Sequence, residues 1–190
     1  ILVALAVFGV VPLLSLLTTA LSPQGTLPQG LVWPTDPHWE NFADAWTAAN
    51  FLALLQSSVL IVLGVVPITV VLATLAGYAL AQLRVPGGTV IYALFLLGLT
   101  LPFESLITPL YYDIRDIGLL GSQLAVILPL IGLLLPFAVF WMRSHFLGAE
   151  PALTEAAILD GASSWQTFFR VHLPLATPAW SALAILDFLA

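Results

Sequence analysis

Glu-Ala-Ala-Ile-Leu-Asp-Gly-Ala-Ser-Ser-Trp-Gln-Thr-Phe-Phe-Arg-Val-His-Leu-Pro, residues 155–174, is a polar, ordered-looking loop between apolar segments of membrane length. The chain around it has a membrane composition, because 61% of its 190 residues are hydrophobic and only 7% are charged. A soluble domain needs far more charge to cover its surface. The sequence therefore predicts an all-α membrane protein with spans on both sides of this loop.

Intervals without charge locate the first three spans. Residues 1–20 carry no charge, and neither do the intervals between Asp44 and Arg84 and between Asp116 and Arg143. A helix needs about 20 apolar residues to cross a bilayer, so each interval is long enough. Small residues on the second span predict close helix packing, namely Gly64, Ala73, Ala76, Gly77 and Ala81.

Two further spans are less regular. We expect a fourth over residues 90–110, interrupted by Pro102 and Glu104, and a fifth that begins near Leu175. Proline removes a backbone donor and favours a kink, which explains the expected interruption. Because the chain begins and ends inside apolar runs, we expect it to be a fragment.

The arginines predict the orientation. Arg84, Arg143 and Arg170 flank two of the loops, whereas residues 22–50 carry acids and no arginine. The positive-inside rule therefore places these three arginines and their loops in the cytoplasm, and residues 22–50 outside. The predicted parts are a first transmembrane helix with an extracytoplasmic connector (1–50), and a transmembrane domain (51–190) with a cytoplasmic loop (143–175).

The cytoplasmic loop predicts two short helices. Residues 152–160 are mostly good helix formers, and Gly161 can adopt the left-handed conformation that ends a helix. Ser163 and Gln166 have the spacing of a capping box, which predicts a second helix that runs until Pro174 breaks it.

Two faces of this loop have different predicted roles. Trp165, Phe168, Phe169 and His172 recur at helical spacing, so we expect four rings on one face that packs under the protein's own spans. The first helix either is a solvated connector or docks a cytoplasmic partner. Docking is favoured by small residues, which permit close approach of another backbone, beside two acids: Ala156, Ala157, Gly161 and Ala162 with Glu155 and Asp160.

The order and spacing of several loop residues are those of the EAA motif. The chain resembles the inner-membrane permeases of binding-protein-dependent ABC importers at Glu155-Ala156-Ala157, Asp160-Gly161-Ala162, Phe168 and Leu173-Pro174. Upstream, residues 77–81 and 84–88 are similar to the end of a permease second span and its cytoplasmic turn. Residues 102, 109–111 and 118–120 resemble the carbohydrate-uptake branch, of the subunit type related to the maltose permease MalG.

This resemblance implies a type I importer fold of the MetI-like kind, a polytopic helical bundle with about five of six spans present and an incomplete C-terminus. It implies a multi-pass subunit in a bacterial-type cytoplasmic membrane that moves a sugar or oligosaccharide inward. The implied partners are ATP-binding subunits, a second permease subunit, an extracytoplasmic solute-binding protein and membrane lipid, and no nucleic acid. Relatives carry an acid where this chain has Thr154, which implies a weaker docking charge.

The same resemblance implies that the first loop helix couples to the ATPase subunit. Glu155 then makes a polar contact, Asp160 orients the turn at Gly161, and the alanines at 156, 157 and 162 allow a close fit. The chain has no phosphate-binding Gly-x-x-x-x-Gly-Lys loop and no lysine, so ATP hydrolysis is expected on another subunit. We expect no catalytic, cofactor or metal site, because no triad or paired carboxylates are found and the histidines are dispersed.

Other functions stay open at this point. The solute could instead be a polyamine, a peptide or an oxyanion. An ion-coupled secondary carrier would use Glu104 or Asp187 as a relay. For Glu104 we favour a structural role near the outer end of its span, with a contact to the pathway or to the partner subunit as the alternative.

Overall fold

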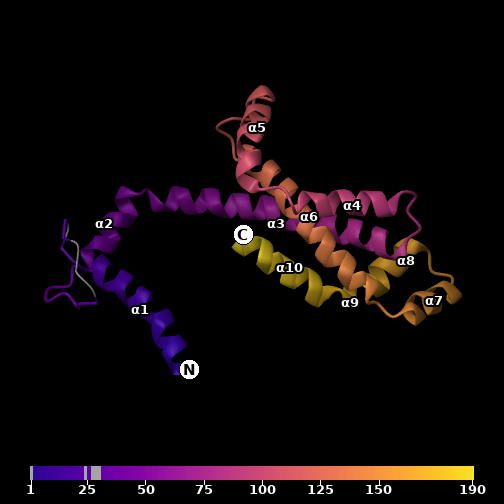
Figure 1. Ribbon diagram of the computed structural model, residues 1–190, viewed down its shortest axis with the longest axis horizontal. Helices are drawn as coiled ribbons and strands as arrows, with labels where there is room; N and C mark the ends of the chain where they lie inside the picture. Colours follow the sequence, from indigo (N-terminus) through magenta and orange to yellow (C-terminus); the bar gives the residue numbers. More distant parts are fainter. Residues whose placement is uncertain (1, 24, 27–30) are drawn as a thin grey trace. The chain divides into compact units, whose positions relative to one another are not determined.

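The computed structural model describes residues 2–23, 25–26 and 31–190 (Figure 1). All the secondary-structure elements in this part of the chain are helices, which confirms the predicted all-α class. Two compact units make up the chain, residues 1–56 and 57–190. Residue 1 of the predicted first span, and residues 24 and 27–30 of the predicted connector, lie outside the described residues.

The first unit holds α1 (Leu2–Ala20), α2 (Glu40–Ala48) and the start of α3 (Phe51–Gln82). The Asn41 side chain donates hydrogen bonds to the carbonyl oxygens of Ala20 and Ser22, at 2.9 and 3.0 Å. Trp46 packs on Phe51 with ring centroids 4.4 Å apart. These contacts join the end of α1 to α2, and α2 to the start of α3.

The second unit holds the rest of α3 and all later helices. They are α4 (Gly88–Gly98), α5 (Phe103–Asp116), α6 (Leu124–Leu147), α7 (Pro151–Leu159), α8 (Ser164–Thr167), the π-helix η1 (Phe168–His172), α9 (Leu173–Leu175) and α10 (Thr177–Leu189).

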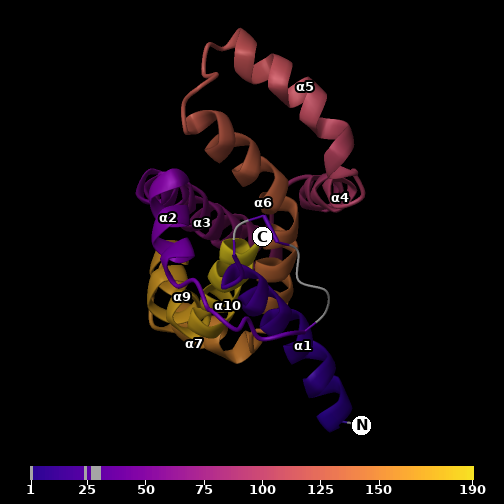
Figure 2. The same cartoon turned by 90° about the vertical axis from the view of Figure 1, so that its left-hand side faces the viewer.

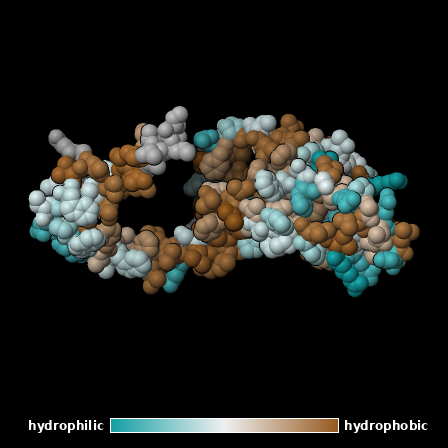
Figure 3. Space-filling model, turned by 90° about the horizontal axis from the view of Figure 1, so that it is seen from below, coloured by the Kyte–Doolittle hydropathy of each residue, from teal (hydrophilic) through white to brown (hydrophobic). Residues whose placement is uncertain are grey.

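Two of the described helices, α3 and α6, are long and apolar enough to cross a membrane. Up to four spans result if the bent pairs α4–α5 and α8–α10 each count as one. Large apolar side chains such as Leu63, Val90 and Leu94 are exposed, and Figure 3 shows broad hydrophobic surfaces. Exposed apolar area on this scale fits contact with lipid.

The interruption predicted at Pro102 is a sharp bend. Helix α4 has 11 residues, about 16 Å, and cannot cross a hydrocarbon core of about 30 Å alone. The chain then turns by 102° into α5, with Pro102 extended in front of the new helix (Figure 2). Residues 90–110 therefore do not form one continuous crossing. Glu104 is exposed in the first turn of α5.

The core of the second unit joins α3, α6, η1 and α10. Ala73, Ala138, Met142 and Leu183 are fully buried in it. A Cβ atom at Gly77 would lie 2.7 Å from the backbone nitrogen of Arg143, so the two helices approach as closely as two backbones allow. The close packing predicted from small residues on the second span is confirmed at Ala73 and Gly77.

Polar contacts join the ends of three helices next to the loop. The guanidinium of Arg143 lies over the Tyr92 ring, 3.9 Å from its centroid, and Arg143 Nε donates to the Leu80 carbonyl at 3.4 Å. Gln82 Nε2 donates to the Phe146 carbonyl at 2.6 Å. These contacts connect α3, α4 and α6 at the end of the bundle from which α7 departs.

Candidate functional site

The predicted helix, turn and helix of the loop are confirmed. Helix α7 ends at Leu159, and Gly161 follows with a left-handed φ of +78°. The Ser163 side chain accepts a hydrogen bond from the backbone N–H of Gln166, and the Gln166 side chain accepts one from the backbone N–H of Ser163. This capping box starts α8. We call α7, the turn and α8 the elbow.

The elbow carries a surface groove with a volume of about 480 Å³. Its walls come from α7 and the turn on one side and from α8 and η1 on the other. Five of the six residues predicted to contact a partner line it, and Glu155 lies outside, exposed on α7. The elbow groove is lined by Leu153, Ala156, Ala157, Asp160, Gly161, Ala162, Gln166, Arg170 and Val171.

The elbow groove has small, apolar walls and a charge on each side. Asp160 belongs to the α7 side and Arg170 to the η1 side, and both are exposed. Among the described residues, neither takes part in an ion pair within 4 Å. A protein surface with a protruding side chain and polar groups beside it would fit such a groove.

The predicted aromatic face is split into two parts. Phe168 and His172 are buried, as expected, and their ring centroids lie 4.7 and 5.2 Å from that of Tyr78. The expectation is wrong for Trp165 and Phe169, which are 66% and 53% exposed and stack on each other. A π-helix is wider than an α-helix, so residues at helical spacing no longer share one narrow face.

Pro174 does not end the second loop helix as predicted. It lies inside α9, which continues η1 without a gap. The break comes after Leu175, where the helix axis turns by 69° into α10. Pro178 lies in the first turn of α10, after this bend, where its missing N–H leaves no helical hydrogen bond unmade.

Thr154 makes a contact with His172 that the sequence did not predict. Its Oγ1 shares a hydrogen bond of 3.0 Å with Nε2 of His172. His172 is 2% exposed. The two residues are eighteen apart, and no local pattern connects them.

The two acids considered for an ion relay lie on separate helices, Glu104 on α5 and Asp187 on α10. Asp187 is 7% exposed and Glu104 is exposed. No hydrogen bond or ion pair in the described part of the chain links either acid to another ionisable group. The described residues therefore show no direct chain of ionisable groups at either acid.

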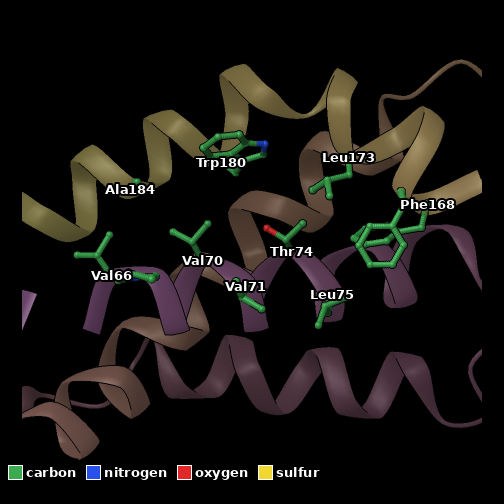
Figure 4. Close-up of a pocket in the computed structure, with 11 residues that line it drawn as sticks. Val66, Val70, Val71, Thr74, Leu75, Phe168, Leu173, Trp180 and Ala184 are labelled. Atoms are coloured by element: carbon green, nitrogen blue, oxygen red, sulfur yellow. The ribbon is translucent and has the colours of Figure 1, made fainter. Parts of the chain in front are cut away.

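A second groove, also of about 480 Å³, lies between α3 and the helices α9 and α10 (Figure 4). Its walls are apolar side chains such as Val70, Leu173 and Ala184, with Thr74 and Trp180 contributing the polar atoms. A sugar needs many hydrogen-bonding partners when it leaves water. This groove is therefore poorly suited to a polyhydroxylated solute.

The model of the family "Binding-protein-dependent transport system inner membrane component" matches residues 69–190, which include the whole elbow. The chain belongs to this family. The match confirms the resemblance seen in the EAA motif. As a member of this permease family the chain is a membrane component of a transport system, and its relatives are named as permease subunits.

Several relatives are similar over nearly the whole chain. The diacetylchitobiose uptake system permease protein NgcG of Streptomyces coelicolor is 36% identical over 97% of this chain and 61% of its own length. The trehalose transport system permease protein SugB of Mycobacterium tuberculosis is 34% identical over 96% of this chain and 66% of its own length. The arabinooligosaccharides transport system permease protein AraQ of Halalkalibacterium halodurans is 34% identical over 96% of this chain and 67% of its own length. The chain thus spans about two thirds of these relatives.

A solved structure shares the fold. It is the crystal structure of a bacterial ABC transporter involved in the import of the acidic polysaccharide alginate. The similarity has a TM-score of 0.81 at 22% identity and covers 99% of this chain and 66% of that one. The predicted helical bundle of the ABC importer kind is confirmed.

Proposed function

We propose that this permease is the transmembrane subunit of an ATP-driven importer that moves a sugar or oligosaccharide across a bacterial-type cytoplasmic membrane. The elbow groove is the observation that carries the proposal. It lies at the end of the spans, and its small side chains let another protein approach closely. The relatives named for diacetylchitobiose, trehalose and arabinooligosaccharides support a carbohydrate solute.

The proposed assembly contains further subunits. A binding protein delivers the solute from outside, a second permease subunit completes the path, and ATP-binding subunits dock on the elbow from the cytoplasm. The permease has no lysine and no phosphate-binding loop, so those subunits supply the hydrolysis.

The elbow residues have distinct proposed roles in docking. The small side chains of Ala156, Ala157 and Ala162 let the ATPase backbone approach closely, and Gly161 makes the turn. Asp160 orients the turn, and Glu155, exposed next to the groove, makes a polar contact. When ATP closes the ATPase pair, the elbow is pushed and the attached α6 and α10 move as rigid bodies.

Reconstitution tests the function. The permease is assembled with its partner subunits and binding protein in proteoliposomes, and uptake of trehalose, diacetylchitobiose and an arabinooligosaccharide is compared with that of spermidine, a peptide and molybdate. We expect ATP-dependent uptake of at least one of the sugars. Uptake of a non-sugar alone would change the solute class, and uptake driven by an ion gradient without ATP would refute the importer.

Glu155→Lys is expected to reduce co-purification of the ATPase subunits at least tenfold and to reduce uptake in parallel. The substitution reverses a charge at the proposed interface, where like charges disfavour association. Glu150→Lys is the matched control, because Glu150 is also exposed but precedes α7 outside the groove. Equal association of both variants would argue against docking at Glu155.

Glu104→Gln is expected to leave uptake within about twofold of wild type. Glu104 is an exposed acid in the first turn of α5, where it complements the helix dipole, and such an effect is small. Uptake and the order of solute preference are measured together. A changed preference or a large loss of uptake would instead establish a contact with the pathway or with the second permease subunit.

A further inference from the structure

His172 lies between the elbow and the membrane helices. On one side its Nε2 shares the 3.0 Å hydrogen bond with Thr154 of α7. On the other side its ring packs on Tyr78 of α3, with centroids 5.2 Å apart. We propose that His172 is a positioning residue that transmits movement of α7 to the spans through these two contacts. This inference rests on the proposed function.

The spans meet His172 in a cluster of four rings. Tyr78 of α3 also packs on Phe146 of α6 at 5.5 Å and on Phe168 of η1 at 4.7 Å. Phe146 and His172 are themselves 6.2 Å apart. All four rings are buried. A close-packed group of this kind passes a displacement on instead of absorbing it, so movement of His172 reaches α3 and α6 together.

Helix α7 has little else to hold it in place. None of its residues is buried, and its main tertiary contacts are to α8 and η1. Among the side-chain hydrogen bonds of the described residues, that between Thr154 and His172 is the one that joins α7 to the rest of the unit. Loss of this bond would loosen α7 on the bundle while leaving its outer face unchanged.

Thr154→Val tests the link because valine keeps the shape of threonine and lacks the hydroxyl. In proteoliposomes containing the complete importer, we expect at least a fivefold fall in trehalose or diacetylchitobiose molecules transported per ATP hydrolysed. The ATPase subunits should co-purify in wild-type amounts. Thr154→Ser keeps the hydroxyl and should stay within twofold of wild type. His172→Phe should behave like Thr154→Val, and His172→Gln, which retains a hydrogen-bonding nitrogen, should recover part of the ratio.

A second readout does not depend on the solute. Residues 1–190 contain no cysteine, so Leu83→Cys, directly after the end of α3 and exposed, provides a label site in this subunit, on which the labelling is then followed. Its maleimide labelling rate should change with ATP in an otherwise wild-type importer and should not change when Thr154→Val is added.

These measurements separate the two proposals. Wild-type importer that takes up no sugar with ATP would end the proposed function, while the labelling rates would still decide the role of His172. An unchanged transport ratio and ATP response in Thr154→Val would overturn the inference. Loss of the ATPase subunits from that variant would also overturn it, because the bond would then serve docking alone.

Discussion

Gly161→Val is expected to abolish ATP-driven uptake and to release the ATPase subunits, while the permease still inserts into the membrane. Gly161 has a φ of +78°, in a region where L-residues are strained and β-branched residues most of all. A Cβ atom there would meet nothing within 4 Å, so crowding does not cause the effect. The backbone must leave the left-handed conformation, which redirects α7 and opens the elbow groove. Uptake, co-purification and membrane content measure the three parts of this result.

A second left-handed glycine serves as the control, because it separates the effect of the position in the elbow from the general effect of replacing such a glycine by valine. Gly87 has a φ of +70° and also has no atom within 4 Å of a built Cβ, but it lies in the turn between α3 and α4. Gly87→Val should keep the ATPase subunits bound. Gly161→Asn should retain part of the uptake, because asparagine tolerates the left-handed region. Full activity of Gly161→Val would refute the docking role of the elbow.

The elbow could be predicted because its chemistry is local. Gly161 ends one helix through its own backbone freedom, and Ser163 with Gln166 starts the next through two reciprocal hydrogen bonds. Each signal lies within a few residues of the structure it causes. The long apolar helices α3 and α6 could be predicted equally well, because the length of a charge-free segment is read directly from the sequence.

Features that depend on packing could not be predicted in the same way. The four rings of the loop have the spacing of one face, yet the π-helix and the position of Tyr78 decide that only Phe168 and His172 are buried. The hydrogen bond between Thr154 and His172 depends on how α7 folds back across the turn. Pro102 indicated a break, but its angle of 102° depends on how α5 and α6 pack.

Gly77→Ala is expected to destabilise the permease by about 1–3 kcal/mol, the usual effect of forcing an extra carbon into a packed core. The added Cβ would lie 2.7 Å from the backbone nitrogen of Arg143 and 2.8 Å from the Cβ of Met142. A flexible side chain could move away, but a backbone nitrogen moves only with its helix. The substitution therefore separates α3 from α6, although alanine itself favours a helix by up to about 1 kcal/mol.

The control for this stability prediction is a glycine without neighbours in the same pair of helices. A Cβ at Gly132 of α6 would meet nothing within 4 Å, so Gly132→Ala adds helix propensity without a clash and should preserve or raise the unfolding temperature in detergent. Gly77→Ala should lower it and reduce the yield of monodisperse protein. If both variants unfold at the wild-type temperature, the close approach at Gly77 does not contribute to stability. If Gly77→Ala alone is unstable, the contact between α3 and α6 holds together the bundle that receives movement from the elbow.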